Sequence, residues 1–293
     1  MQQHQQQETL FAFGLGYSAQ ALARRLSAHG WRCGGTVRSA AKATSLTETF
    51  GQVDVFDDSK AVPVPVPEGA HWLISVPPGE IGCPVFATFE GQAHKAASIT
   101  YLSTTGVYGD LKGNWAFEWT PVAPRSNRAK ARVLAETQWA GTGRPFRTVR
   151  LPGIYGPGRS PFTRIKSGKA RRIIKAGQVF SRVHVDDIAS GLEAMMLRPE
   201  ALGVFHLCDD APAPPQDVTA YAAALMGVPA PEPISFEQAE LSPMARSFYA
   251  ECKRVSNART KSALDWFPVY KTYESGLKQV LETERKSTPD ASS

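Results

Sequence analysis

Six residues near the start of the chain, Gly14-Leu15-Gly16-Tyr17-Ser18-Ala19, constrain its fold more than any other feature. They follow a short apolar run, residues 9–13, and precede a segment with apolar residues at helical spacing. In such a turn the first glycine permits the bend, the second lets the backbone approach a pyrophosphate, and the small third residue allows close helix packing. Amides at the start of the helix then face the phosphates. We therefore predict a dinucleotide site at Gly14, Gly16, Tyr17, Ser18 and Ala19.

Strand-like and helix-like segments alternate after this turn. Apolar strand patterns cover residues 31–37, 53–56, 71–76 and 98–103, and helical patterns begin near Ala40 and include residues 87–96. Alternating prolines at 63, 65 and 67 indicate an extended surface connection, because proline cannot pair within a central strand. The alternation predicts a parallel sheet with helices on both faces. This context favours a phosphate-binding turn over an ordinary strand-to-helix turn, which uses the same glycines.

The second half of the chain continues the pattern less regularly. A helix is predicted over residues 127–140, a strand over 146–151, and an amphipathic helix around Ile188, Leu192 and Met195. We predict an α/β fold, a doubly wound parallel (Rossmann) sheet with a smaller C-terminal substrate lobe. The expected parts are a dinucleotide-binding core at 9–160, the lobe at 161–283, and disordered tails at 1–8 and 286–293. Some lobe elements, including a strand at 204–207, are expected to return to the core.

Composition narrows the class of protein. No apolar run approaches the roughly 20 residues of a membrane helix, and the opening MQQHQQQE lacks signal-peptide features. We expect a cytoplasmic monomer or homodimer that acts on a small molecule, away from membranes. The four cysteines lie far apart in the sequence, so we predict reduced, structural thiols and no metal site. A net charge of +6 favours anionic partners without choosing between a dinucleotide and a nucleic acid.

The end of the second predicted strand bears on cofactor choice. An acidic residue there would bind the ribose 2′-hydroxyl of NAD, whereas an arginine accommodates the 2′-phosphate of NADP. The sequence has Arg38 about 20 residues after the glycines and no carboxylate beside it. A solvated surface arginine is the alternative. We predict NADP (NADPH) in preference to NAD, with Asp57, after the third strand, as a further cofactor-binding candidate.

Three later segments carry a family resemblance. They are Ser103-Thr104-Thr105-Gly106-Val107-Tyr108-Gly109, Arg150-Leu151-Pro152-Gly153-Ile154-Tyr155-Gly156-Pro157-Gly158-Arg159 and Val183-His184-Val185-Asp186-Asp187-Ile188-Ala189. Their order resembles the extended short-chain dehydrogenase/reductases, the NAD-dependent epimerase/dehydratase group, and residues 74–79 look like an atypical branch. The resemblance implies that Thr104 hydrogen-bonds the substrate oxygen. It also implies that Val76 and Pro77 pass beside the cofactor, and that Pro152 and Gly153 lie near the nicotinamide.

The sequence departs from this family at the proton relay. Family enzymes carry a tyrosine and a lysine four residues apart on the helix after the serine strand. The matching positions here are Arg128 and Arg132, or Ser126 and Lys130 in another register. Arginine stays protonated near pH 7 and cannot exchange the proton.

Other side chains near the expected site have competing interpretations. Tyr108 and Tyr155 are substitute phenols, with Tyr108 our catalytic candidate, although a buried tyrosine with a satisfied hydroxyl is the alternative for both. His184 and Asp187 suggest acid–base work, but we favour helix capping by Asp186 or Asp187.

Substrate recognition also departs from the family pattern. Phe180 stands where nucleotide-sugar epimerases carry a diphosphate-binding arginine. A basic run at residues 164–175 is either an anion site or a solvated face. The aromatic residues Trp115, Phe117 and Trp119 alternate in a long connection, either as a lid over the pocket or as a satellite hydrophobic cluster.

These features lead to one main hypothesis and two rivals. The main hypothesis is an NADP-dependent oxidoreductase or epimerase-like enzyme that acts on a small polar or anionic substrate, with water or an unidentified phenol as proton source. A non-catalytic NADPH-binding sensor or assembly factor is the first rival, favoured by the missing tyrosine. RNA binding is the second, and we do not expect it, because no aromatic residues interleave with the basic run as a stacking platform requires.

Overall fold

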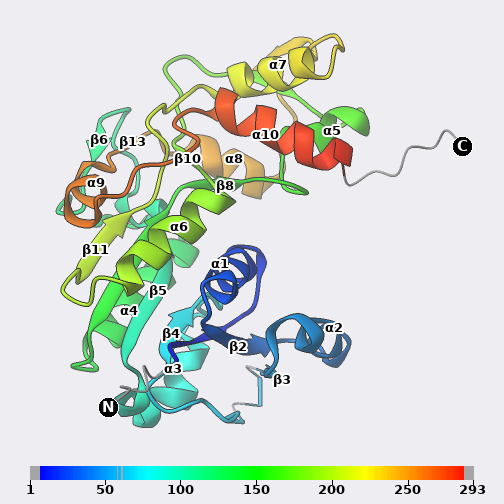
Figure 1. Cartoon of the computed structure of the whole chain (residues 1–293). Coiled ribbons are helices and arrows are strands. Elements are labelled where there is room, and N and C mark those ends of the chain that lie inside the picture. Colours follow the sequence, from blue (N-terminus) through cyan, green and yellow to red (C-terminus); the bar gives the residue numbers. More distant parts are fainter. Residues whose placement is uncertain (1–6, 58, 61, 287–293) are drawn as a thin grey trace, which may run out of the picture.

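A computed structural model describes residues 7–57, 59–60 and 62–286 of the chain (Figure 1). The tails predicted at 1–8 and 286–293 lie mostly outside these residues. The described end of the first tail contacts the sheet, because the Glu8 carboxylate lies 3.2 Å from Nε2 of His71 in β4 (His71–Ile74). Lys286 is the last residue of helix α10.

A seven-stranded parallel sheet forms the centre of the molecule. Its order is β11-β7-β5-β4-β1-β2-β3, and every neighbouring pair is parallel. The strands are β1 (Thr9–Phe13), β2 (Arg32–Val37), β3 (Val53–Val55), β4 (His71–Ile74), β5 (Ser98–Thr104), β7 (Phe146–Leu151) and β11 (Gly203–His206). Strand order reverses between β1 and β4, which is the doubly wound arrangement. The predicted fold class is confirmed, and the strand expected at 204–207 pairs with β7 at the edge of the sheet.

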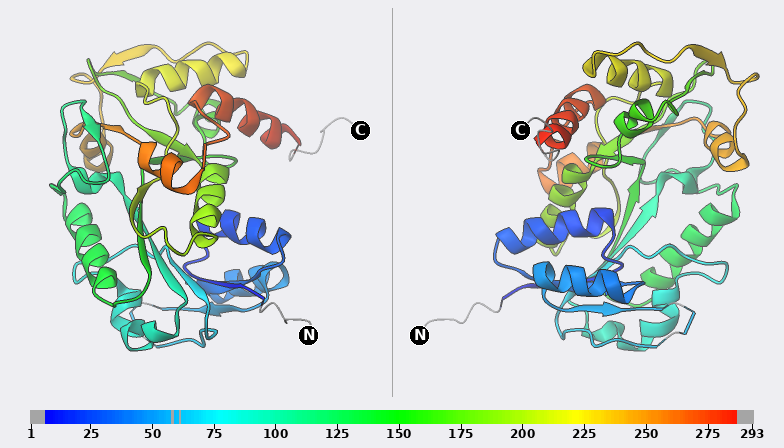
Figure 2. Two further views of the ribbon diagram at one scale, coloured as in Figure 1. Left: turned by 60° about the vertical axis from the view of Figure 1, so that its left-hand side comes forward. Right: turned by 90° about the vertical axis from the view of Figure 1, so that its right-hand side faces the viewer.

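Helices cover both faces of this sheet, so its strands are buried on both sides. They are α1 (Tyr17–Ala28), α2 (Ala40–Phe50), α3 (Pro84–Phe89), α4 (Asn127–Ala140) and α6 (Val185–Met196), with a 3-10 helix η1 (Glu90–Lys95) after α3. Figure 2 shows α4 on one side of the sheet and α1 and α2 on the other. The single helix expected over 87–96 is therefore wrong in part, since a 3-10 helix covers its second half.

The residues of β1 show how the two faces are built. Leu10 and Ala12 join a hydrophobic cluster with residues of α1, α2 and α6. Phe11 and Phe13 point to the opposite face and join a second cluster that includes Trp72. The rings of Phe13 and Trp72 meet edge to face, with their centroids 5.1 Å apart. Alternation along a strand sends neighbouring side chains to opposite faces, so a run of apolar residues fills both layers.

The remaining elements form a lobe beyond the C-terminal edge of the sheet (Figures 1 and 2). Its helices are α5 (Pro161–Lys166), α7 (Pro215–Leu225), α8 (Pro243–Tyr249) and α10 (Tyr273–Lys286). Helix α9 (Ala258–Leu264) instead packs beside β11, and its Leu264 joins the same hydrophobic cluster as Leu10 of β1. Three short parallel pairs complete the lobe: β8 (Gly153–Tyr155) with β10 (Arg182–His184), β9 (Arg172–Ile174) with β12 (Pro233–Ser235), and β6 (Trp115–Ala116) with β13 (Arg254–Val255). A 3-10 helix η2 (Thr105–Tyr108) follows β5.

All four cysteines are free thiols.

Candidate functional site

The glycine turn lies where the strand order reverses, at the C-terminal end of β1. Gly14 has a φ of +90°, a conformation that side chains other than glycine rarely adopt. Ser75, after β4, donates a hydrogen bond of 2.5 Å from Oγ to the carbonyl of Gly14. A Cβ added at Gly14 would lie 2.9 Å from this Oγ. Packing inside the protein therefore explains this glycine.

Gly16 has a different explanation. It precedes α1 with a φ of −86° and a ψ of −166°, which any residue adopts. The nearest atom to an added Cβ is the carbonyl oxygen of Gly14, at 3.9 Å. Neither conformation nor contact with the described protein thus requires glycine here. The open space in front of its backbone fits the close approach of a pyrophosphate to the start of the helix.

The other predicted residues of the turn lie in the first turn of α1. Ser18 and Ala19 are buried. Tyr17 is half-buried, and its hydroxyl donates a hydrogen bond of 2.9 Å to the carbonyl of Pro157 in the lobe. Burial raises the pKa of Tyr17 to about 12. This phenol therefore stays protonated and links the glycine turn to the lobe.

Hydrogen bonds hold the end of β2 against the glycine turn. The Gly14 amide donates to Oγ1 of Thr36 at 3.0 Å, and the Leu15 amide donates to the Thr36 carbonyl at 2.7 Å. Arg38 follows two residues later and is exposed. Among the described residues, no hydrogen bond or ion pair engages its guanidinium. This arrangement leaves Arg38 available near the turn.

Asp57, after β3, is engaged locally. Its Oδ1 accepts hydrogen bonds from the amide of Ser59 at 3.0 Å and from the Ser59 hydroxyl at 2.6 Å. Lys60 Nζ lies 3.4 Å from Oδ2. The hydrogen bonds from Ser59 lower the pKa of Asp57, so the carboxylate is ionised at neutral pH.

The remaining predicted site residues come together at the same edge of the sheet. Thr104 ends β5 and is half-buried, and its Oγ1 accepts a hydrogen bond of 3.2 Å from the Gly106 amide. Val76 and Pro77 follow β4, which pairs with β5 on one side. Pro152 and Gly153 follow β7, which pairs with β5 on the other, with Leu151 opposite Thr104. Because parallel strands end at one edge, these segments and the glycine turn lie along the same edge of the sheet.

The two family positions without tyrosine and lysine hold engaged arginines. Arg132 Nη1 donates to the carbonyl of Leu102 at 2.6 Å and to the hydroxyl of Tyr101 at 3.2 Å. The guanidinium carbon of Arg128 lies 5.5 Å from the ring centroid of Phe248 on α8. Arg132 is therefore hydrogen-bonded to the backbone of β5, while Arg128 stacks on an aromatic ring of the lobe.

The alternative register also lacks a proton relay. Ser126 caps α4, with its Oγ accepting a hydrogen bond of 3.2 Å from the Ala129 amide. Lys130 is exposed. Neither register contains a phenol.

Tyr108, the catalytic candidate, is fully buried with its hydroxyl engaged. The hydroxyl accepts a hydrogen bond of 2.8 Å from Nη1 of Arg150 and lies 2.6 Å from Nε2 of His206. His206 Nδ1 must carry a proton, because its partner at 2.8 Å is the carbonyl of Ser256. In neutral His206, Nε2 is then the acceptor and Tyr108 the donor. Burial raises the pKa of Tyr108 to about 12 and lowers that of His206 to about 4.

A buried ion pair continues this network toward Thr104. Arg150 binds Glu136 on α4 through two bonds, Nε to Oε1 at 3.1 Å and Nη2 to Oε2 at 2.6 Å. The hydroxyl of Ser103 donates to Oε1 of Glu136 at 2.5 Å. The network therefore fixes Ser103, the residue before Thr104, from behind the sheet. Sequence analysis missed this role, because an arginine in a strand gives no indication of a partner on another element.

The aromatic connection alternates as its sequence suggested, with Trp115, Phe117 and Trp119 on the less buried side. The rings of Phe117 and Trp119 stack with centroids 5.0 Å apart, and Trp119 is 72% exposed. The buried positions that alternate with the three aromatic residues are Ala116 and Glu118. The satellite-cluster interpretation is therefore wrong for the aromatic side chains, since Ala116 packs in that cluster instead. Burial raises the pKa of Glu118, whose Oε1 lies 3.8 Å from Nδ1 of His206.

The start of α6 is capped by a different residue from the one expected. Nδ1 of His184 accepts a hydrogen bond of 3.2 Å from the Asp186 amide. Asp187 is buried and accepts instead from the amides of Val269 at 2.7 Å and Tyr270 at 3.1 Å. The prediction that Asp186 or Asp187 caps the helix is therefore wrong. His184 and Asp187 nevertheless have structural roles, as favoured, because both are engaged in hydrogen bonds with backbone amides.

Tyr155 is the second substitute phenol of the sequence analysis. Its ring packs edge to face on that of His184, with the centroids 5.2 Å apart. Burial raises the pKa of Tyr155 and lowers that of His184. Both side chains therefore stay neutral inside the lobe.

Comparisons with known proteins were made with this geometry in hand. No family model matches the chain. It is 28% identical to protein YeeZ of Escherichia coli over 242 residues, which cover 75% of this chain and 84% of YeeZ. It is 44% identical to the solved structure of a functionally unknown conserved protein from Silicibacter pomeroyi, with a TM-score of 0.88, covering 94% of this chain and 99% of that one.

More distant structures share the fold. The human epimerase family protein SDR39U1, solved with NADPH, has 16% identity and a TM-score of 0.70, over 94% of this chain and 99% of that chain. Two dTDP-glucose 4,6-dehydratases with the same fold were solved with NAD. In the described part of the chain, no helix has the length and apolar character needed to cross a membrane.

The doubly wound sheet and these structures show that the chain has the fold of the extended short-chain dehydrogenase/reductases of the NAD-dependent epimerase/dehydratase type, to which its three sequence landmarks are similar.

Proposed function

We propose that the chain binds NADPH at the C-terminal edge of the sheet and uses it for hydride transfer to or from a small polar substrate. The observation that carries this proposal is Gly16, whose absent side chain is explained by no contact in the described protein. A cofactor phosphate against that backbone would explain it. We further propose that residues 9–160 form the cofactor-binding core and residues 161–283 the substrate lobe of a cytoplasmic protein.

Arg38 supports NADPH over NADH. It is exposed, follows β2 directly, and lies near the glycine turn with no described partner. The human relative was solved with NADPH and the two dehydratases with NAD, so fold alone does not decide the preference. A charge-assisted contact with the 2′-phosphate contributes about 1.5 to 3 kcal/mol, or roughly ten- to a hundredfold in affinity.

The test of cofactor preference is Arg38→Ala, titrated with NADPH and NADH by nicotinamide fluorescence. We expect about ten- to a hundredfold weaker NADPH binding and almost unchanged NADH binding. Arg32→Ala is the matched control, because Arg32 is also exposed but lies at the opposite end of β2. Equal losses for both cofactors in Arg38→Ala would show that this arginine does not read the phosphate.

Thr104 is the residue that we propose to orient the reacting oxygen of the substrate. It ends β5 beside the segments that follow β4 and β7, and its neighbour Ser103 is fixed by Glu136. Bound NADPH would supply the hydride. The Tyr108 hydroxyl donates its hydrogen bond to His206 within the core. We therefore assign the proton exchange of the reaction to solvent water and not to this phenol.

A further inference from the structure

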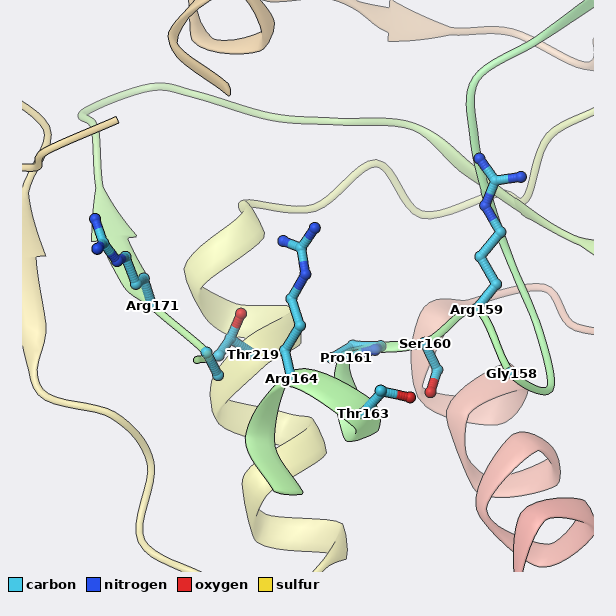
Figure 3. Close-up of a pocket in the computed structure, with 9 residues that line it drawn as sticks. Gly158, Arg159, Ser160, Pro161, Thr163, Arg164, Arg171 and Thr219 are labelled. Atoms are coloured by element: carbon cyan, nitrogen blue, oxygen red, sulfur yellow. The ribbon is translucent and has the colours of Figure 1, made fainter. Parts of the chain in front are cut away.

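A cavity of about 460 Å³ lies in the lobe between α5, β9 and α7 (Figure 3). Three arginines line it: Arg159, Arg164 and Arg171. The Thr163 hydroxyl also lines it, while the hydroxyls of Ser160 and Thr219 line it but already donate to Glu284 and to the carbonyl of Pro215. No lining residue is acidic or aromatic. Its volume lies within the range of about 300 to 1,000 Å³ found for small-molecule sites.

The positive charge on the cavity wall is little neutralised. Arg164 is exposed, and among the described residues no hydrogen bond or ion pair engages its guanidinium. Arg159 lies over the ring of Tyr17, 5.9 Å from its centroid, and Arg171 donates from Nη1 to the carbonyl of Glu240. Neither contact supplies a negative charge.

One carboxylate approaches the rim of the cavity. Glu284 on α10 accepts hydrogen bonds from the Gly158 amide at 3.1 Å and from the Ser160 hydroxyl at 3.2 Å. Lys166 Nζ lies 3.8 Å from Oε2 of Glu284 and offsets its charge. The three arginines therefore leave the cavity with net positive charge.

We propose that this cavity binds a phosphorylated small molecule and recognises it without a nucleobase. Guanidinium groups match phosphate oxygens in geometry, and a phosphomonoester carries between one and two negative charges at neutral pH. The cavity is too large for a phosphate ion alone, so an organic group fills the remaining volume. Without an aromatic side chain in the lining, a base has no surface on which to stack.

The structure also separates the two interpretations of the basic run. Arg164 and Arg171 line the cavity. Lys175 turns away, with its Nζ donating to the carbonyl of Tyr249. Lys169 is exposed outside the cavity lining. Part of the run is therefore the anion site and part is a solvated face.

The cavity adjoins the glycine turn. Tyr17, which follows Gly16, lies beneath Arg159 and donates its hydroxyl proton to Pro157 in the same loop. The ligand of the cavity is thus placed to be the phosphorylated end of the substrate. This assignment as substrate rests on the proposed function, whereas binding in the cavity does not.

Calorimetric titration of the full chain with glucose 1-phosphate, uridine monophosphate and glucose tests the proposal. We expect both phosphomonoesters to bind within about threefold of each other, and glucose not to bind. Saturating NADPH keeps the probes out of the cofactor site. If NADPH does not bind, titration of the arginine variants still shows whether the cavity binds a phosphomonoester. Failure of the cofactor site and failure of the cavity site are therefore distinguishable.

The variant that tests the arginines is Arg164→Gln/Arg171→Gln, and it should weaken glucose 1-phosphate by about tenfold or more. Lys169→Gln/Lys278→Gln removes the same charge from exposed positions outside the cavity and should bind like the wild type. Unchanged affinity in the arginine variant, or an equal loss in the lysine variant, would overturn the site. Binding of uridine monophosphate more than tenfold tighter than glucose 1-phosphate would overturn recognition without a base.

Discussion

Replacing Glu136 by glutamine tests the buried network behind the site. The Arg150 and Glu136 side chains are 7% and 10% exposed and share two hydrogen bonds of 2.6 and 3.1 Å. Breaking a buried pair by removing one charge costs about 3 to 5 kcal/mol, because the other charge remains unpaired. Glutamine still offers one acceptor oxygen, so we expect the lower end, about 3 kcal/mol. For a chain of this size, that loss lowers the melting temperature by about 5 °C.

Urea unfolding at pH 7, followed by circular dichroism, measures the free energy of unfolding. Lys60→Gln removes one partner of an exposed pair, 73% and 39% exposed, and should have no measurable effect. Adding Arg150→Met to Glu136→Gln should recover part of the loss, because the unpaired charge is then gone. A loss below about 1 kcal/mol in Glu136→Gln would refute the argument that this buried ion pair stabilises the fold.

Two further predictions concern the network and the substrate side. Burial lowers the pKa of His206 from 6.5 to about 4, so the folded protein holds this histidine neutral where the unfolded chain would protonate it. Its contribution to the free energy of unfolding is therefore complete above pH 6.5 and is lost as the pH falls toward 4. Between these values the wild type should lose up to about 3 kcal/mol more than His206→Asn, measured by urea unfolding at several pH values. Thr104→Ala should keep NADPH affinity within a few-fold while abolishing hydride transfer, with Thr104→Ser retaining part of it. Weaker cofactor binding with intact transfer would reverse the assignment of Thr104.

The sheet and its windings were predictable because their signals are local. The apolar run of β1 and the glycines after it identify the strand and the turn within eleven residues of sequence. The split of the segment at 87–96 into α3 and η1 was not predictable from apolar spacing, which is similar in both kinds of helix.

The buried polar groups were much harder to predict. Arg147 in β7 is fully buried, and its Nε donates to the carbonyl of Ala201 at 2.6 Å. Glu118, between two aromatic residues of the long connection, is buried beside His206. Each partner lies more than 50 residues away in the sequence, so pairing depends on the tertiary fold. By contrast, the cofactor-side residues follow strand ends, and the parallel topology gathers strand ends at one edge.

Binding of NADPH to Gly16→Val tests the central claim most directly. Valine fits the backbone conformation at this position, and apart from its chain neighbours an added Cβ meets no described protein atom closer than 3.9 Å, so the variant should fold like the wild type. Gly91→Val is the matched control, because an added Cβ there also meets nothing within 4 Å and the residue lies in η1. Fluorescence titration should show that Gly16→Val no longer binds NADPH and that Gly91→Val binds it normally. Unchanged NADPH affinity in a folded Gly16→Val protein would contradict a cofactor site at this turn.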